Sequence, residues 1–322
     1  MKILVTGASG FIGSHLTRRL LENKHSVRLL LHHRHFPGES ECSVVWGDIT
    51  DPGILKKALE DRDIVFHLSA ALGASLIGAE EFRRINVEGT EKLLFYAEKA
   101  GVKRFIHFSS AGVLGRVEAN SPADEKHTPY PIDVYDLTKL EGEKAALEAG
   151  GNKMEVVIIR PGWVYGPEDK RTFKLIRAIA RKRFVLVSRG NTRQTPVYVN
   201  DLIQGILLCA EKGKSGEIYH MAGHEVLTVR DIVRTIAQAV GTKIPRVRLS
   251  LLPVKTAAWI LGKSFRFFGK EAPLTPSKLS FFIHPKPLSI EKARRELGYA
   301  PQMDFSTGIK KTVEWYREKG WM

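Results

Sequence analysis

Short apolar runs alternate with amphipathic stretches over the first two-thirds of the chain. The runs are apolar at consecutive positions, which indicates strands that are buried on both faces. The stretches between them repeat their apolar residues at helical spacing. This alternation predicts an α/β fold with a doubly wound parallel sheet. The predicted strands are Lys2–Thr6, Ser26–Leu31, Ser43–Trp46, Ile64–Leu68, Arg104–Ser109 and Glu155–Arg160, and the predicted helices are Ser14–Asn23, Pro52–Glu60, Glu80–Ala100 and Val134–Ala149.

The alternation of strands and helices becomes irregular after about residue 165. Irregular segments there separate three predicted helices, Thr172–Arg183, Asn200–Glu211 and Val229–Val240. We expect residues 1–165 to form the core that contains the sheet. Residues 166–322 should form mainly a smaller lobe over its C-terminal edge, with some segments returning to the core sheet. The chain has no repeat and no low-complexity linker, so both parts are expected to fold as one unit.

Three glycines follow the first predicted strand at three-residue spacing, Gly7, Gly10 and Gly13. Glycine allows a tight turn and a close approach of the backbone to a pyrophosphate, which the free N–H groups of the next helix then bind. The strand–turn–helix context therefore predicts a Rossmann-type dinucleotide site.

Two further segments bear on the choice of dinucleotide. Asp48 follows the third predicted strand, where its carboxylate can accept a hydrogen bond from an adenine amino group, whereas Asp51 is better placed as a helix N-cap. The second predicted strand ends in a basic segment that includes His32 and Arg34 and contains no carboxylate for ribose hydroxyls. A basic surface loop would look the same, but a 2′-phosphate would suit this segment, so the sequence favours NADP over NAD.

A tyrosine and a lysine lie four residues apart, Tyr135 and Lys139, and therefore share one face of a predicted helix. A phenol is a poor base at neutral pH, and a neighbouring ammonium group should lower its pKa. A serine hydroxyl can orient the substrate oxygen, and Ser109 and Ser110 lie at the end of the fifth predicted strand. We assign Tyr135 as the acid/base, Lys139 as its modulator and one of these serines as the orienting hydroxyl. These groups suit proton exchange during hydride transfer at a secondary alcohol or ketone.

The order of these motifs resembles the extended short-chain dehydrogenase/reductase superfamily over nearly the whole chain. The segments that resemble it are Thr6–Gly13, Asp48, Ser109–Gly112, Tyr135–Lys139, Arg160–Pro167, Val197–Asp201 and Lys292–Pro301. The resemblance implies that Ser110, which directly precedes Ala111 and Gly112, is the orienting hydroxyl rather than Ser109. It also implies that Asn86 ties helix to sheet and that His67 lies along the cofactor groove, although a packed histidine is the simpler interpretation of His67. It implies cofactor contacts at Gly7, Ser9, Gly10, Phe11, Ile12, His32, Arg34, Asp48, Ile49, Leu68, Ala70, Tyr135, Lys139, Pro161 and Gly162, and substrate contacts at Ser110, Ala111, Trp163 and Arg193.

The resemblance covers several reactions that share the hydride step. Dehydratases of this kind carry an Asp-Glu pair where this chain has Ala111 and Gly112. Many nucleotide-sugar epimerases place an arginine for the substrate diphosphate where this chain has Gln194, and Arg193 could serve with a shift of one residue. The first expectation is a nucleotide-sugar epimerase or dehydrogenase.

The alternative is a reductase or dehydrogenase of an apolar hydroxy or keto compound. Residues 251–283 are rich in aromatic and aliphatic side chains, and the stretch Ala272–Thr275 resembles the hydroxysteroid dehydrogenase and dihydroflavonol reductase branch. Such residues could also simply pack the lobe. A third possibility, from another class, is a non-catalytic NAD(P)-binding redox sensor, which would not need Tyr135 and Lys139.

Composition excludes several other classes. The net charge is +15, but no aromatic residues interleave with a basic stripe, so we expect no nucleic-acid partner and instead an anionic substrate or cofactor. No metal site and no membrane span are predicted, and the chain enters a strand at once, so we expect no signal peptide. The two cysteines, Cys42 and Cys209, are expected to be reduced in a cytoplasmic protein. By resemblance, helices Glu80–Ala100 and Val134–Ala149 would form a homodimer.

Overall fold

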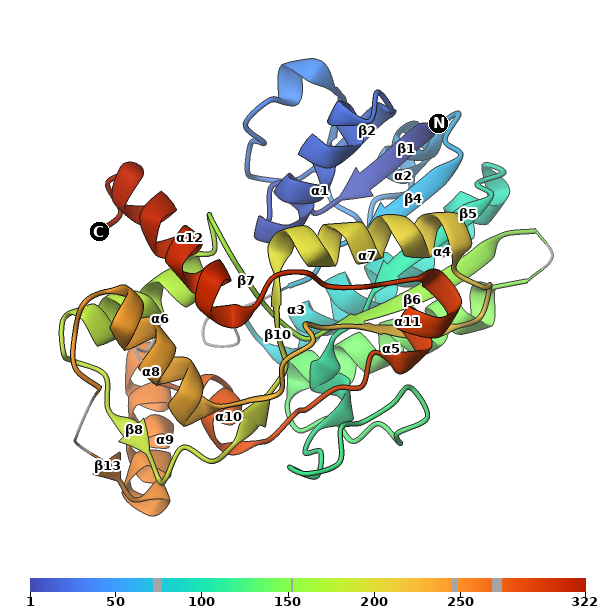
Figure 1. Ribbon diagram of the computed structural model, residues 1–322. Helices are drawn as coiled ribbons and strands as arrows, with labels where there is room; N and C mark the ends of the chain where they lie inside the picture. The colour runs from blue at the N-terminus through green and yellow to red at the C-terminus, as the bar shows by residue number, and fades with distance from the viewer. Residues whose placement is uncertain (72–76, 152, 245–247, 268–273) are drawn as a thin grey trace.

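The centre of the molecule is a seven-stranded parallel sheet in the order β11-β6-β5-β4-β1-β2-β3 (Figure 1). The computed structural model describes residues 1–71, 77–151, 153–244, 248–267 and 274–322. The strand order reverses between β1 and β4, which is the doubly wound arrangement predicted from the sequence. The strands are β1 Lys2–Thr6, β2 Ser26–Leu31, β3 Ser43–Trp46, β4 Ile64–His67, β5 Arg104–Phe108, β6 Glu155–Pro161 and β11 Ile218–Met221.

Helices cover both faces of this sheet, and alternate residues of each strand pack in opposite directions. In β1, Ile3 and Val5 pack with α1 and α7 on one face, whereas Leu4 packs with α2, α4 and α5 on the other. Both faces of the sheet are therefore shielded from water, which explains why its strands are apolar at consecutive positions. The helices are α1 Phe11–Glu22, α2 Pro52–Leu59, α4 Gly89–Lys99, α5 Val134–Ala149 and α7 Val199–Lys212, with short 3-10 turns η1 Glu39–Glu41 and η3 Ala111–Leu114.

The helix predicted over residues 80–100 is interrupted. It consists of α3 Ala79–Arg83, a π-helical turn η2 Arg84–Glu88, and α4. Asn86 lies inside the π-helical turn and is buried. Such turns insert one extra residue into the helical ladder and are frequent at functional sites.

A smaller lobe lies beside the carboxyl edge of the sheet, at the lower left of Figure 1. Its helices are α6 Lys170–Ala180, α8 Val229–Ala239, α9 Leu251–Phe267, α10 Pro276–Ile283 and α12 Phe305–Glu318. Short strand pairs link them: β7 Trp163–Tyr165 with β10 Pro196–Tyr198, β9 Arg193–Gln194 with β12 Leu227–Thr228, and β8 Leu186–Val187 with β13 Arg248–Leu249.

Later segments of the chain also pack against the sheet. Strand β11 pairs with β6 at its edge, and α7 and α11, Glu291–Leu297, contribute to the same core cluster as α1. Among the described residues, no helix combines the length and the apolar content needed to cross a bilayer. Cys42 and Cys209 are free thiols, as predicted.

Candidate active site

The turn after β1 fits a dinucleotide. Gly7 has a φ of +75°, and a Cβ at this position would lie 2.7 Å from the carbonyl carbon of Leu68. A Cβ at Gly13 would overlap the carbonyl oxygen of Gly7. Both positions are filled by backbone, so only glycine lets β1, the turn and α1 pack this closely, and α1 begins directly after Gly10 with first N–H groups that have no partner within the helix. These glycines form a cradle for an anion, and the residues present fit the pyrophosphate of a nicotinamide dinucleotide.

The other residues implied as cofactor contacts differ in exposure. The side chain of Ile49 is buried in the core, so only its main chain could reach a ligand. His67 is also buried, and its ring nitrogens bond to Thr6 and Thr90, so the expectation that it lines the groove was wrong and it is a packed histidine. The remaining residues are half-buried and follow β1, β4 and β6: Ser9, Phe11, Ile12, Leu68, Ala70, Pro161 and Gly162.

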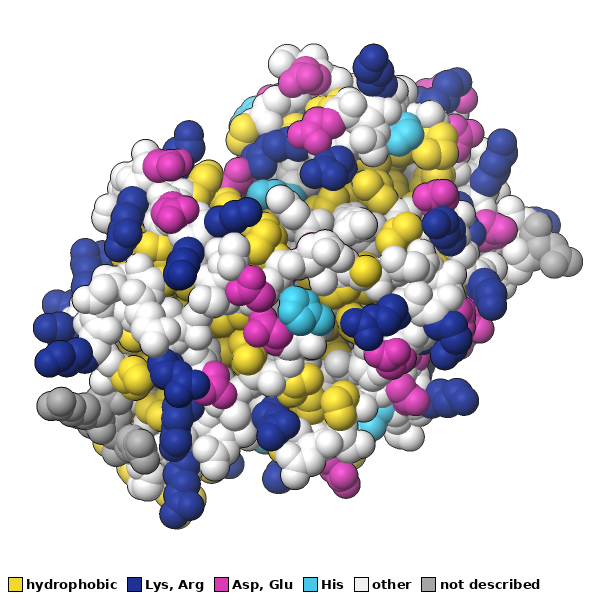
Figure 2. All heavy atoms as spheres, viewed as in Figure 1, with side chains coloured by type: hydrophobic (Ala, Val, Ile, Leu, Met, Phe, Trp, Pro, Cys, Tyr) yellow, Lys and Arg dark blue, Asp and Glu magenta, His cyan; other side chains and the backbone are white. Residues whose placement is uncertain are grey.

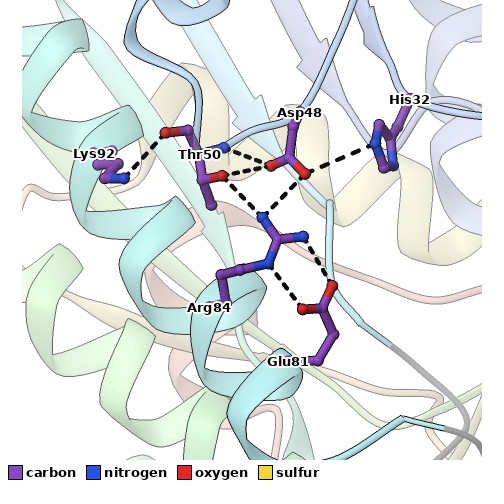
Figure 3. Close-up of polar contacts among 6 residues, drawn as sticks. All are labelled: His32, Asp48, Thr50, Glu81, Arg84 and Lys92. Carbon is purple, nitrogen blue, oxygen red and sulfur yellow. Dashed lines mark hydrogen bonds and ion pairs between the residues drawn. The ribbon is translucent and has the colours of Figure 1, made fainter.

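The carboxylate of Asp48 is held in a polar network at the end of β3 (Figure 3). One of its oxygens accepts the backbone N–H and the hydroxyl of Thr50, each at 2.8 Å, and the other accepts Nη1 of Arg84 at 3.0 Å. Arg84 also donates to both oxygens of Glu81, each at 2.8 Å. His32 Nε2 lies 3.8 Å from Asp48.

This network keeps Asp48 ionised. Burial opposes ionisation, but the hydrogen bonds from Thr50 and Arg84 hold the pKa of Asp48 below its ordinary value. Sequence reasoning found Asp48 and His32 but missed Arg84, which is 36 residues away from Asp48. The spacing of Glu81 and Arg84 on one helical face was the available signal. Arg34 is exposed beyond this network.

The predicted catalytic side chains come from β5 and α5. Ser110 follows β5, and its hydroxyl accepts the N–H of Gly112 at 2.9 Å. Tyr135 and Lys139 lie on one face of α5, which Asp133 caps by accepting the N–H of Asp136. A contact with the Ser110 hydroxyl stabilises the ionised form of Tyr135, so the two side chains lie together. The structure thus brings serine, tyrosine and lysine to one place.

The charge state of Tyr135 differs from the expectation. Burial raises its pKa to about 12, against the opposing effects of Arg171 and Ser110. Burial also lowers the pKa of Lys139 to about 8, while Glu143 raises it. The pKa of Tyr135 is therefore raised, not lowered as the sequence led us to expect, because desolvation of the phenol is the largest effect. Tyr135 is a neutral phenol at neutral pH and is ready to donate its proton.

Asn86 fixes α5 relative to the sheet, in the role that the resemblance implies. Its side-chain oxygen accepts the N–H of Ala71, after β4, at 2.7 Å. Its amide donates to the hydroxyl of Thr138 at 3.0 Å, and Thr138 directly precedes Lys139. A Cβ at Gly142 would lie 2.6 Å from the carbonyl oxygen of Asn86, so α5 approaches this segment closely.

A buried ion pair also fixes α5. Arg160, near the end of β6, donates to Glu143 of α5 from Nε at 2.9 Å and from Nη2 at 2.5 Å. Both side chains are only 2% exposed. Glu143 lies one helical turn beyond Lys139, so this pair joins the catalytic helix to the strand that carries Pro161.

A second ion pair connects α5 to the lobe. Asp136 lies directly over the backbone of Gly112, and its carboxylate is 3.7 Å from the ammonium group of Lys286. Burial raises the pKa of Asp136 to about 6, although Lys286 opposes that shift. Ala111, implied as a substrate contact, is buried beside Asp136, so only its main chain could reach a ligand.

The structure weakens the diphosphate role of Arg193. The amide of Gln194 is buried and donates to the carbonyl oxygens of Phe281 at 2.7 Å and His284 at 3.0 Å. Successive side chains of a strand point to opposite faces, so Arg193 points away from these carbonyl oxygens. The position at which many epimerases have an arginine is therefore used here to tie β9 to α10. Trp163 belongs to an aromatic cluster, with its ring centroid 4.8 Å from that of Phe281.

A cavity of about 310 Å³ lies between this lobe and the start of α5. Its wall includes Ile132 and Asp133, which directly precede the catalytic helix. The other wall comes from α9, α10 and the residue after α10. The lining residues are mainly apolar: Ile132, Asp133, Lys255, Trp259, Pro276, Leu279, Ser280, Ile283 and His284. Ala272 and Pro273 of the predicted apolar stretch lie outside the described residues.

Comparisons with known proteins show the family of the chain. The family model for the NAD dependent epimerase/dehydratase family matches residues 3–222. The chain is 31% identical to a 3 beta-hydroxysteroid dehydrogenase/Delta 5-->4-isomerase of Mycobacterium tuberculosis, covering 98% of this chain and 90% of that protein. It is 31% identical to a 2-alkyl-3-oxoalkanoate reductase of Stenotrophomonas maltophilia, covering 97% of this chain and 98% of that protein.

A solved structure with a similar fold is the UDP-glucose 4-epimerase of Thermotoga maritima with UDP-glucose. Its TM-score is 0.82 and its identity 25%, with 99% of each chain covered. Similar proteins therefore include both nucleotide-sugar enzymes and enzymes named for apolar hydroxy or keto compounds.

Proposed function

The chain belongs to the NAD dependent epimerase/dehydratase family, and within it we propose that the protein reduces a bulky apolar ketone to a secondary alcohol. The protein is an NAD(P)-dependent enzyme of the extended short-chain dehydrogenase type, and its chemistry is hydride transfer. For the substrate class, the sequence alone favours a nucleotide sugar.

The apolar cavity beside α5 is the observation that supports this choice. Trp259, Leu279 and Ile283 give it an apolar wall, and its opposite wall includes Asp133, which precedes the catalytic tyrosine by two residues in the chain. A nucleotide sugar needs cationic donors for its diphosphate, and the position where many epimerases have an arginine is Gln194 here, whose amide is used within the protein. The relatives described above that are named for steroid and oxoalkanoate substrates are also 31% identical over nearly their whole length.

The chain's own residues can perform the proton chemistry of a reduction. The bound cofactor supplies the hydride. Ser110 can donate a hydrogen bond to the carbonyl oxygen and polarise it. Tyr135, whose pKa is about 12, keeps its proton at neutral pH and can deliver it to that oxygen as an alcohol forms. Lys139, whose pKa is about 8, is largely charged at neutral pH and can stabilise the resulting phenolate.

We propose that the cofactor is NADPH rather than NADH, because His32 and Arg34 are exposed beyond β2. Exposed apolar side chains on α4 and α5, including Phe95 and Leu137, would suit a homodimer interface. The two free thiols would suit the cytoplasm. We also propose that residues 1–165 bind the cofactor and that residues 166–322 mainly bind the substrate.

The test is a comparison of substrates with the purified protein. The protein is mixed with NADPH or NADH and a bulky apolar ketone, such as a 3-ketosteroid or a 2-alkyl-3-oxo acid, and the nicotinamide absorbance is followed. We expect that absorbance to fall with the ketone, and Tyr135→Phe to abolish the change. Conversion of UDP-glucose to UDP-galactose without net cofactor consumption would refute the proposal, as would no turnover of any apolar ketone.

A further inference from the structure

The positive charge of the chain is concentrated in the small lobe. Residues 170–200 contain nine Lys or Arg and residues 232–270 contain eight, and neither segment contains any Asp or Glu. The rest of the chain has 33 Lys or Arg against 35 Asp or Glu. The net charge of +15 is therefore not a general property of the surface. Figure 2 shows Lys and Arg side chains gathered at the lower left, over the lobe that contains α8, α9 and β8.

Helix α9 in this lobe buries Val254 and Ala258 but leaves several larger apolar residues exposed. Val254 and Ala258 are buried against Leu279 and form a small core cluster. In contrast, Leu252 is 78% exposed and Ile260 is 51% exposed. Trp259, which also lines the cavity, is 55% exposed. A helix packed only for folding would bury its largest apolar side chains, because these gain most from leaving water.

The basic and apolar residues are held on one part of the lobe. Strand β8 pairs with β13, and the N–H of Ser188 donates to the carbonyl oxygen of Leu249 at 2.8 Å. Arg181 and Arg183 lie in the turn that leads into β8, and Leu249 directly precedes α9. Leu249 is itself 45% exposed. Exposed Lys255 is one turn beyond Leu252 on α9.

We propose that this surface docks onto an anionic lipid bilayer. We call it the docking face, defined by Leu249, Leu252, Lys255, Trp259 and Ile260 together with Arg181 and Arg183. Exposed aliphatic and indole side chains beside basic residues are typical of segments that lie in a membrane interface. Lys and Arg near the surface are attracted to anionic headgroups. Phosphates of a nucleic acid would attract the charges equally, but they give no reason for exposed Leu252 and Ile260.

The docking face adjoins the cavity, since Lys255 and Trp259 belong to both. If the substrate is an apolar ketone, as the proposed function holds, it could pass from the bilayer to the cavity without crossing water. This consequence rests on the proposed function, whereas docking itself does not.

The experiment is sedimentation of the full-length protein with vesicles. One set contains phosphatidylcholine alone and the other also contains about 30% phosphatidylglycerol. We expect binding to the anionic vesicles and much less to the neutral ones, with weakening at high salt. Arg181→Glu/Arg183→Glu and Leu252→Glu should each weaken binding at least about tenfold. The charge-matched control Lys56→Glu/Lys57→Glu, on α2, should change binding by no more than about twofold.

Several results would overturn docking. Equal sedimentation with neutral and anionic vesicles would do so, as would Leu252→Glu or the double arginine variant binding like the unmodified protein. Binding to duplex RNA that is lost in the arginine variant but unchanged in Leu252→Glu, without vesicle binding, would assign the surface to nucleic acid instead. Ketone turnover is measured without vesicles, so a failed sedimentation assay and a failed proposed function are distinguishable.

Discussion

Removing the charge of Glu143 is the sharpest test of how the active site is held. In Glu143→Gln, the amide is nearly the same size as the carboxylate, so packing is kept. Arg160 would then remain charged in a site where it is 2% exposed. A guanidinium group cannot lose its proton to escape this cost. The variant therefore isolates the electrostatic contribution of the pair.

The expected loss follows from the burial of both partners. Breaking a buried pair by neutralising one partner costs about 3–5 kcal/mol of unfolding free energy. The bidentate geometry, with distances of 2.9 and 2.5 Å, places this pair among those with good alignment. The pair of Arg104 and Glu155 is the control, because Glu155 is 56% exposed and Glu155→Gln should cost less than about 1 kcal/mol.

Urea unfolding followed by circular dichroism measures these losses. A double variant, Arg160→Met/Glu143→Leu, should recover most of the stability lost in Glu143→Gln, since no unpaired charge is left. Glu143 raises the pKa of Lys139, so Glu143→Gln should lower that pKa. The alkaline limb of the reductase pH profile should then move to lower pH. The reasoning fails if Glu143→Gln loses no more stability than Glu155→Gln, or if the double variant is less stable than the single.

Three other predictions test the rest of the site. Tyr135→Phe should lower kcat by about 100-fold or more while the dinucleotide Kd, from fluorescence titration, stays within a few-fold; unchanged turnover would contradict the acid assignment. In the same titration, Gly13→Ala should weaken dinucleotide binding at least about tenfold, because its Cβ would overlap Gly7, and unchanged affinity would contradict the cradle. Burial raises the pKa of Asp136 to about 6, so between roughly pH 4 and 6 the folded protein binds a proton that the unfolded chain does not. The free energy of unfolding should therefore fall by up to about 3 kcal/mol as the pH rises through that window. Asp136→Asn should remove this slope in urea midpoints, and an identical slope in the variant would refute it.

The sheet was predictable because its physical cause is local. A strand covered by helices on both faces must be apolar throughout, and the predicted bounds of β1, β2 and β3 agree with the structure. Strand β11 was not predicted, since its four residues include His220 and give too short an apolar run. The break at Arg84–Glu88 was also missed, because the contact of Asn86 with Ala71 that accompanies it cannot be read from helical periodicity.

The site was predictable only where its residues are close in sequence. Tyr135 and Lys139 are related by one helical turn, so their alignment follows from spacing. The partners of Arg84, Glu143 and Asp136 lie far along the chain, and only the fold brings them together. Arg160 did give a signal, because it is a charged residue that continues the apolar run of β6, and such a residue needs a buried partner.

The contacts of α5 connect the proton donor to the substrate cavity. Lys286, which pairs with Asp136 next to Tyr135, forms a backbone bridge to Gln194. Gln194 in turn holds the carbonyl oxygens at the end of α10, whose side chains line the cavity. A shift of α10 as a substrate enters would therefore act on the first turn of α5, at Asp136. On the opposite side, the contact with Glu143 holds α5 against β6, so such a shift would change the cavity wall more than the distance from the phenol to the cofactor groove.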